Sequence, residues 1–340
     1  MQTKQRKKLS SVAFLLIITI ALFIVLYAAG MIAFADKGFA KPQMFMNLFI
    51  SNAGLIVIGC GLTIVMITGG IDISVGSVTA LVCMVSADLM QNKGMSAFAA
   101  LLAALLIGLA FGLVQGYLVA YLDIQPFIIT LAGLFFGRGM TAVISTDMIA
   151  IKNPVFLAWA NFKIKLPIGY TKSSGKFIPA YIYPTVIVAI IVVILISVML
   201  HRTKFGRALY AIGGNQQSAV MMGLNVRKVK YMAYILDGLL AGLGGFLFCL
   251  NSCAGFVEQA KGLEMDAISA AVIGGTLLSG GVGTVVGTLF GVLIKGTIAS
   301  LITTQGTLSS WWVRIVLSGL LCFFIVLQAI IAKASTKKKE

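Results

Sequence analysis

Residue types that carry catalytic chemistry are scarce in this chain and do not cluster. Its 340 residues include ten acidic side chains and one histidine, His201, which we place at a membrane interface. Neither the H-E-x-x-H spacing of a zinc site nor the G-x-S-x-G turn of a hydrolase occurs. We therefore expect no catalytic residue, no metal site and no enzyme activity. The cysteines are expected to be packing residues; they are Cys60, Cys83, Cys249, Cys253 and Cys322.

Four charged residues fall inside apolar segments. They are Arg138, Asp237, Lys295 and Arg314. A charge in hydrocarbon is costly, so such side chains face protein or water. We expect Asp237 to form an ion pair with one of the cations, and lining of a polar route is the alternative. Lys295 and Arg314 are expected to extend their charged ends to the membrane surface.

The elements that position these residues are membrane-spanning helices. The chain is 59% hydrophobic and 11% charged, which is typical of a polytopic membrane protein. Its apolar runs are long enough for helices that cross about 30 Å of hydrocarbon. We predict an all-α fold in a single transmembrane domain, residues 1–340. The ten predicted spans are 11–35, 45–67, 73–90, 96–120, 126–145, 180–200, 229–251, 265–280, 283–303 and 311–332.

The distribution of basic residues predicts the orientation in the membrane. Both ends of the chain and the loop 201–230 are rich in Lys and Arg, which places all three in the cytosol. The loop 146–178 then lies outside the cytoplasm, although it also carries five lysines. The net charge of +16 is attributed to these flanking segments, so nucleic-acid binding is not expected. We expect residues 11–35 to be an uncleaved span rather than a signal peptide.

Two short segments share a glycine-rich pattern. Residues 69–77 read GGIDISVGS and residues 274–284 read GGTLLSGGVGT. Glycine-broken segments in both halves of a transporter often line the translocation pathway; a pair of similar tight turns is the alternative. Within the first break, Asp72 is expected to cap a helix start. The candidate pathway-break residues are Gly69, Gly70, Asp72, Ser74, Gly274, Gly275 and Ser279.

Small residues also recur at every fourth position on two predicted helices. One series is Gly108, Gly112 and Gly116, and the other is Gly283, Gly287 and Gly291. Such spacing lets helix backbones approach closely. We expect packing within the bundle, with an interface between two permeases or a sliding gate as the alternative.

The loop 201–230 predicts a short capped helix. Gly213 and Gly214 break the preceding segment, Asn215 is a plausible N-cap, and Gly223 is a plausible stop after Met222. A helix fixed at both ends and flanked by basic residues suits rigid docking of another protein. The alternative is an amphipathic helix on lipid headgroups. The chain has no G-x-x-x-x-G-K-[ST] motif, so it carries no P-loop ATPase of its own.

Residues 45–332 resemble a permease of the monosaccharide ABC importers. The matching stretches are ITGGIDISVGS (67–77), PFIITLAGLFFGRG (126–139), FGRALYAIGGN (205–215) and LEMDAISAAVIGGTLLSGGVGTVVGTLFG (263–291). Within that class, VIGGTLLSGGVGTVVGTLFGV and GTLSSWW (306–312) are most similar to the galactofuranose-type permease.

This resemblance implies a transporter subunit in the bacterial cytoplasmic (inner) membrane. It implies two permeases, two ATPase subunits and an extracytoplasmic sugar-binding protein, with ATP and Mg²⁺ bound on the ATPase and no cofactor in this chain. The galactofuranose-type match implies a heterodimer with a second permease, and a homodimer is the alternative. Gly213, Gly214, Asn215 and Gly223 would belong to the helix that docks the ATPase. Glu264 and Asp266 would cap a helix or meet the binding protein.

Amides within apolar spans are candidate contacts for the sugar, because a buried amide needs a partner. They are Asn52, Gln115 and Asn251, and hydrogen bonding between helices is the alternative role for each. Asp237 departs from the small or neutral residue expected at its position. Together with Arg138 and Lys295 it motivates a second hypothesis, an ion-coupled secondary sugar transporter that needs no ATPase.

Overall fold

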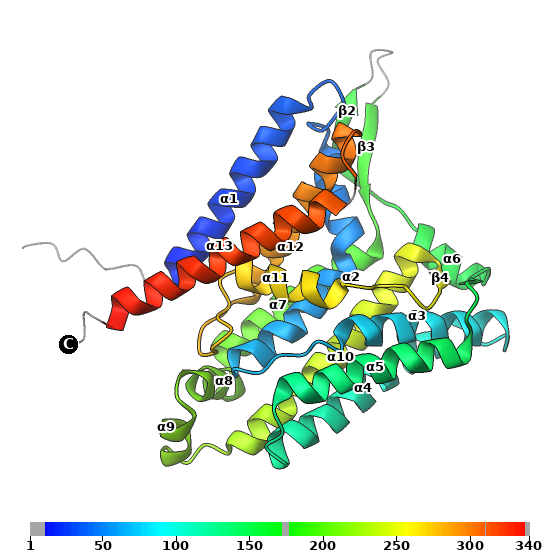
Figure 1. Ribbon diagram of the computed structural model, residues 1–340. Coiled ribbons are helices and arrows are strands. Elements are labelled where there is room, and N and C mark those ends of the chain that lie inside the picture. Colours follow the sequence, from blue (N-terminus) through cyan, green and yellow to red (C-terminus); the bar gives the residue numbers. More distant parts are fainter. Residues whose placement is uncertain (1–10, 172–176, 310, 337–340) are drawn as a thin grey trace, which may run out of the picture.

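The computed structural model describes residues 11–171, 177–309 and 311–336, and these are mostly helical (Figure 1). The all-helical fold that the sequence predicts is confirmed. The helices are α1 Ser11–Ala33, α2 Pro42–Ile67, α3 Val75–Gln91, α4 Ala97–Tyr121, α5 Pro126–Ile144, α6 Pro154–Asn161, α7 Pro184–Arg202, α8 Lys204–Gly214, α9 Gln216–Met221, α10 Val226–Ser252, α11 Leu263–Ile273, α12 Val285–Gln305 and α13 Trp311–Thr336.

Eight helices in the described part of the chain are long and apolar enough to cross a membrane. They are α1, α2, α4, α5, α7, α10, α12 and α13. The two remaining predicted spans correspond to α3 and α11, which are shorter. The span predicted over 265–280 ends as a helix at Ile273, because Gly274 and Gly275 follow and Gly275 has φ +90°. The described residues thus contain eight candidate spans and the shorter apolar helix α3, so the predicted count of ten spans is approximate.

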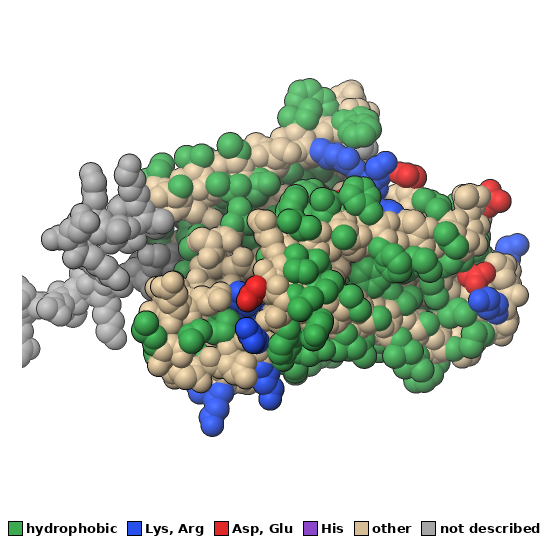
Figure 2. All heavy atoms as spheres, turned by 60° about the horizontal axis from the view of Figure 1, so that its bottom comes forward, with side chains coloured by type: hydrophobic (Ala, Val, Ile, Leu, Met, Phe, Trp, Pro, Cys, Tyr) green, Lys and Arg blue, Asp and Glu red, His purple; other side chains and the backbone are tan. Residues whose placement is uncertain are grey.

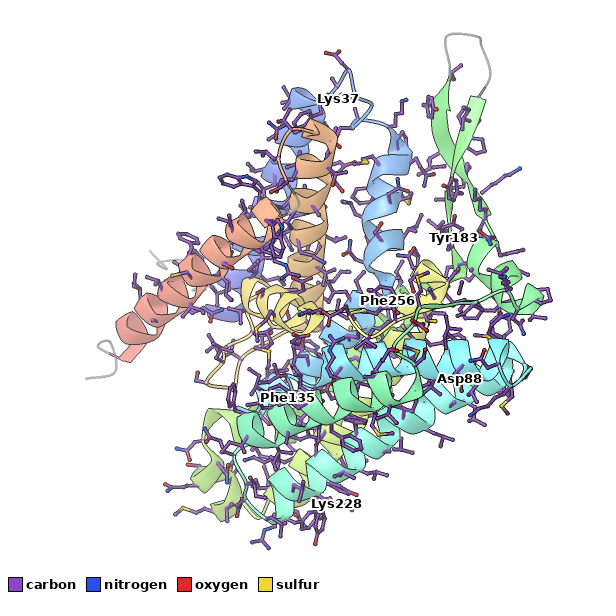
Figure 3. The ribbon with its side chains drawn as sticks, turned by 45° about the vertical axis from the view of Figure 1, so that its right-hand side comes forward. Lys37, Asp88, Phe135, Tyr183, Lys228 and Phe256 are labelled. Atoms are coloured by element: carbon purple, nitrogen blue, oxygen red, sulfur yellow. The ribbon has the colours of Figure 1, made fainter. Side chains whose placement is uncertain are left out.

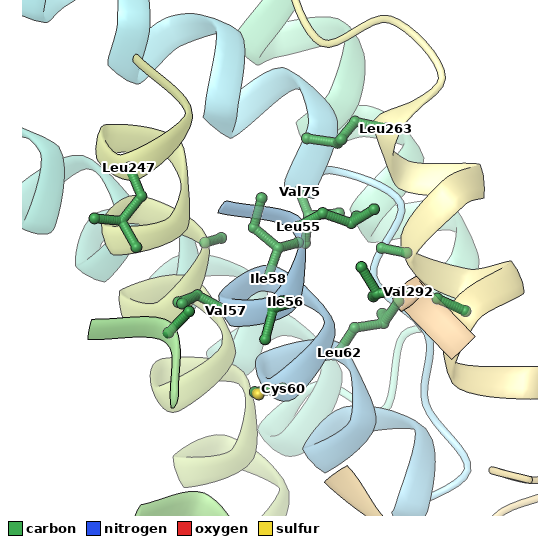
Figure 4. Close-up of a cluster of buried hydrophobic side chains, with 14 of the residues drawn as sticks. Leu55, Ile56, Val57, Ile58, Cys60, Leu62, Val75, Leu247, Leu263 and Val292 are labelled. Atoms are coloured by element: carbon green, nitrogen blue, oxygen red, sulfur yellow. The ribbon is translucent and has the colours of Figure 1, made fainter. Parts of the chain in front are cut away.

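Helix α2 lies at the centre of the bundle. Its sequence is apolar on every side, so it is buried against neighbours around its whole circumference. Figure 1 shows α1, α12 and α13 on one side of it and α3, α4 and α5 on the other. Figure 4 shows Leu55, Ile58 and Leu62 of α2 among side chains from α3, α10, α11 and α12. Because α2 ends at Ile67, directly before the first glycine-rich break, its packing positions that break within the bundle.

Helix backbones meet closely at the glycine series. On α4, Gly108 lies against the Gly238 carbonyl and Gly112 against the Tyr234 carbonyl of α10, so a side chain at either glycine would strike backbone. On α12, Gly287 lies against Gly274, and Gly291 packs on Ala270 of α11 in the same way. Packing within the bundle, the role that the spacing predicts, is confirmed for these residues.

The bundle has two distinct ends. One, here called the hairpin end, carries α6 and the antiparallel strands β2 (Ile164–Thr171) and β3 (Phe177–Ile182), with Ile164 opposite Ile182. The other, called the α9 end, carries α8 and α9 (Figure 1). The loops predicted outside and inside the cytoplasm thus lie at different ends. The side chains of the basic terminal residues, and Lys172 and Lys176, lie outside the described residues, and the orientation itself stays a prediction.

The outer surface of the bundle suits a lipid environment. Figure 2 shows one face largely covered by hydrophobic side chains, with the charged side chains in view gathered in a few groups. Exposed apolar residues on α4, α5 and α13 belong to this surface, among them Phe98, Phe135 and Trp311. Such a continuous apolar surface is expected where lipid replaces water.

Candidate functional site

The first break, predicted over residues 69–77, is non-helical at residues 68–74 and joins α2 to α3 through a buried polar network. Asp72 Oδ1 accepts hydrogen bonds from the Ser74 backbone N–H at 2.6 Å and from the Ser74 hydroxyl at 2.7 Å. Gln115 of α4 donates to Ser74 Oγ at 2.9 Å. Ser77 Oγ donates to the Ser74 carbonyl at 2.7 Å. Asp72 therefore orders the turn before α3, but the predicted cap is not formed, because Ser74 stands at the helix start and no side chain of the described residues caps the first turn of α3.

Asp237 of α10 lies close to this break, and its surroundings contradict the predicted ion pair. Its side chain is fully buried, and neither carboxylate oxygen receives a hydrogen bond from an N–H or hydroxyl group of the described residues. Gly61 of α2 faces it so closely that a Cβ there would lie 2.5 Å from Oδ1. The charged group that acts on it is another acid, Asp72. Asp237 thus occupies a tightly packed helix crossing, with no ion pair in the described part of the chain.

The cations that were expected to pair with Asp237 have other partners. Arg138 of α5 donates to the carbonyls of Val257 at 3.0 Å and Gln259 at 2.5 Å. Lys295 of α12 pairs with Asp266 of α11 at 2.9 Å, so the prediction that it extends to the membrane surface is wrong. Arg314 is exposed, and its guanidinium lies over the Trp311 ring at 5.1 Å; its extension to the membrane surface stays a prediction.

The second break, residues 274–284, meets the first break and the end of α8 through backbone contacts. The Gly281 N–H donates to the Ile67 carbonyl at 2.8 Å, at the end of α2. A Cβ at Gly280 would lie 2.7 Å from Gly69 N, and one at Gly281 would lie 2.8 Å from Gly214 N. A Cβ at Gly213 would strike Ile67 O and Gly281 N. We call these five residues the glycine junction: Gly69, Gly213, Gly214, Gly280 and Gly281.

Helix α9 projects next to the glycine junction and has the predicted caps. Asn215 Oδ1 accepts the Ser218 N–H at 2.8 Å, and Gly223 has φ +79°. Ala219 is buried, whereas Met221 is 88% exposed. Lys230 of α10 donates to Gln216 Oε1 at 2.7 Å, which fixes α9 to the bundle. A short rigid helix therefore presents apolar side chains outward at the α9 end.

A loop from the hairpin end folds back into the bundle before α11. Figure 3 shows Phe256 in the middle of the molecule, between Lys37 toward one end and Lys228 toward the other. The two Arg138 hydrogen bonds anchor this loop, and Gln259 Nε2 donates to Ser252 Oγ at 2.7 Å. Helix α11 thus begins inside the bundle. Its N-terminal end, which carries partial positive charge, points into the interior.

The two acids at the start of α11 differ in position. Glu264 Oε2 is buried against Gly76 at the start of α3, and contact between Glu264 and a binding protein stays a prediction. Asp266 faces Lys295, and the side chains are 29% and 20% exposed. Glu264 lies where a helix start favours negative charge, whereas Asp266 retains contact with open space.

That open space consists of two cavities that share Lys295 as a lining residue. The outer cavity, about 410 Å³, lies between α2 and α12, and its polar lining includes Asn47, Ser51, Asn52 and Thr303. The inner cavity, about 370 Å³, lies between α10, α12 and the folded-back loop, and Asp266 and Gln259 line it. Lys37 donates to the Thr304 carbonyl at 2.9 Å, so the outer cavity reaches toward the hairpin end.

The three candidate pathway amides are not brought together. Asn52 lines the outer cavity, and its amide donates to the Leu48 carbonyl at 2.8 Å. Gln115 is committed to Ser74 and borders a separate, largely apolar cavity between α4 and α5. Asn251 lines a small cavity beside Tyr183 and Thr185. Of the three, only Asn52 lines one of the two cavities that share Lys295, and the roles of all three in sugar contact stay predictions.

Comparison with known proteins decides the family. The family model described as "Branched-chain amino acid transport system / permease component" matches residues 44–326. This chain is an ABC importer permease of that family. The permease is 42% identical to the inner membrane ABC transporter permease protein YjfF of Escherichia coli K12, over 92% of its own length and 91% of the relative's.

Two further relatives carry sugar names. The permease is 34% identical to the fructose import permease protein FruG of Bifidobacterium longum, over 94% of its length and 92% of the relative's. It is 36% identical to the ribose import permease protein RbsC of Bacillus subtilis, over 87% of each chain. No solved structure matched it. The permease is therefore a multi-pass membrane component of the sugar ABC importers, which work with an ATPase, a binding protein and a sugar.

Sequence reasoning missed the ion pair and the folded-back loop of the permease. The available signals were a lysine inside an apolar segment and an acid at the start of the preceding helix, with Asp266 and Lys295 separated by 29 positions. Pairing them required knowledge that α11 and α12 run antiparallel after the glycine break. The sequence pattern alone did not supply that geometry.

Proposed function

We propose that this permease moves a ring-form monosaccharide, of the galactofuranose type or another hexose or pentose, into the cytosol. A separate ATPase supplies the energy and binds ATP and Mg²⁺, so this chain needs no cofactor of its own. A second, different permease completes the membrane channel, and an extracytoplasmic binding protein delivers the sugar. The galactofuranose-type sequence similarity and the sugar names of two relatives support this choice of cargo.

The geometry at the α9 end carries the proposal. Val220 and Met221 are 57% and 88% exposed on a helix that is capped at its start and fastened to α10. Apolar side chains on a rigid projection suit insertion into a groove of a partner protein. The glycine junction then links this helix by backbone contacts to both breaks in the membrane helices. ATP can favour one conformation of the importer only to the extent that it binds that conformation more tightly than the other.

Substitution Met221→Glu tests the docking role of α9. The side chain is exposed, so the fold should persist, whereas a carboxylate in an apolar groove carries a large desolvation cost. We expect co-purification of the ATPase in mild detergent to fall at least tenfold. Met95→Glu, at an exposed methionine near the hairpin end, is the matched control and should retain the ATPase. Full retention of the ATPase by Met221→Glu would contradict the docking role and reopen the ion-coupled alternative.

A further inference from the structure

The Lys295–Asp266 pair lies deep in the membrane-spanning part of the permease. Lys295 is ten residues before the end of α12 at Gln305, which is about 15 Å along a helix. That distance is about half of the ~30 Å hydrocarbon thickness. Asn52, ten residues into α2, lies at the same level, because its Nδ2 would be 2.7 Å from a Cβ at Gly296. The pair therefore sits near the membrane midplane, between two cavities.

Both side chains keep unused hydrogen-bonding capacity. Lys295 Nζ contacts Asp266 Oδ2 at 2.9 Å, and neither side chain makes another hydrogen bond within the described residues. An ammonium has three donors and a carboxylate has about four acceptor sites. Exposures of 20% and 29% leave part of that capacity facing the cavities. Each cavity, at about 370 and 410 Å³, lies within the size range of small-molecule sites.

We propose that the Lys295–Asp266 pair is a contact site for the sugar in transit and that it divides the two cavities in the present conformation. This rests on the function proposed above. Adjacent hydroxyl groups of one sugar can donate to the carboxylate and accept from the ammonium together. The pair has no net charge and offers both donors and acceptors, which suits a neutral monosaccharide.

A purely structural ion pair between α11 and α12 makes a different prediction. Removing one partner of such a pair leaves an unpaired charge, but replacing both with apolar residues is often harmless. A sugar-contact site is not restored by that double replacement, because both the donors and the acceptors are lost. The comparison of single and double variants therefore separates the two roles.

The test uses the complex co-purified from its native membrane and reconstituted in liposomes with ATP inside and the binding protein outside. We measure uptake of radiolabelled neutral hexoses and pentoses, and of a deoxy analogue of the sugar that the wild type transports fastest. The variants are Lys295→Met, Asp266→Asn and the double variant Lys295→Met/Asp266→Leu. We expect uptake turnover to fall at least tenfold in all three. We also expect the preference for the parent sugar over its deoxy analogue to shrink.

The control is a second Lys–Asp pair, which lies far from the two cavities. Lys93→Met breaks the Lys93–Asp88 pair at the hairpin end and should leave uptake unchanged. Recovery of uptake in the double variant, or normal uptake in both single variants, would overturn the contact role. Failure of the wild-type complex to transport any monosaccharide would instead contradict the proposed cargo, and the contact role with it.

Discussion

Two carboxylates inside the membrane-spanning part of this permease have opposite surroundings. Asp237 is fully buried at a helix crossing, with an acid beside it and no cation among the described residues around it. Asp266 has a lysine at 2.9 Å and borders open space. The same residue type is thus enclosed by close packing in one region and faces a cavity in the other. We infer that conformational rigidity belongs to the Asp237 region and cargo contact to the Asp266 region.

Glycines account for the close packing of the Asp237 region. Around Asp237, helices α2, α4 and α10 approach through Gly61, Gly108 and Gly238, and the space that a larger residue would need is filled by backbone. Asp266, in the first turn of α11, lies directly after the folded-back loop and borders a cavity. Close packing at glycine is not confined to that crossing, because Gly274, which ends α11, also lies against the Gly287 backbone.

The largest expected effect is in the packed region. Substitution Gly108→Val would place methyl groups against the Gly238 carbonyl and the Gly242 backbone, which cannot move aside independently. We expect the free energy of unfolding to fall by about 3 kcal/mol or more. Thermal unfolding of the detergent-purified permease measures it. Gly139→Val is the control, because nothing lies within 4 Å of a Cβ at Gly139. An equal fall in unfolding free energy in both variants would contradict the importance of close backbone packing between α4 and α10.

A smaller effect is expected in the cavity region. Substitution Asp266→Asn removes the charge that faces Lys295 and leaves a half-buried ammonium unpaired. We expect the free energy of unfolding to fall by about 2 kcal/mol, which lies between the values typical of exposed and of fully buried ion pairs. The same unfolding assay measures it, with Asp88→Asn as the control because its partner Lys93 is 62% exposed. Unchanged stability of Asp266→Asn would mean that water in the cavities already screens the pair.

The smallest effect, with the opposite sign, is expected at Asp237. Substitution Asp237→Asn keeps the size of the side chain and replaces a fully buried carboxyl group that has no cation partner among the described residues and lies beside Asp72. We expect the free energy of unfolding to stay level or to rise by about 1 kcal/mol. A marked loss of stability in this variant would reveal that the carboxylate has a favourable partner and would erase the contrast with Asp266.

The predictable part of this fold was local. Hydrophobic runs predicted the helices, and the Asn215 cap with Gly223 predicted α9. The repeat of small residues at every fourth position predicted the packing of Gly108 and Gly112. Each of these depends on residues within a few turns of one another. Local patterns were therefore enough for the elements and for several contacts between them.

The candidate site was less predictable because it depends on contacts between distant segments. The partners of Asp237 and Lys295 are decided by how α10, α11 and α12 cross, which hydropathy does not encode. The loop that carries Phe256 looks like an ordinary connection in the sequence, yet Arg138 anchors it within the bundle. The predicted pathway amides were separated for the same reason.

ATP-driven uptake by the reconstituted complex tests the central claim most directly. The complex is placed in liposomes with ATP inside and the binding protein and a labelled monosaccharide outside, and ionophores abolish the proton and sodium gradients. We expect uptake to require ATP, to survive the ionophores and to be lost in Met221→Glu. Uptake that continues without ATP, disappears with the ionophores and is indifferent to Met221→Glu would contradict an ATP-driven permease.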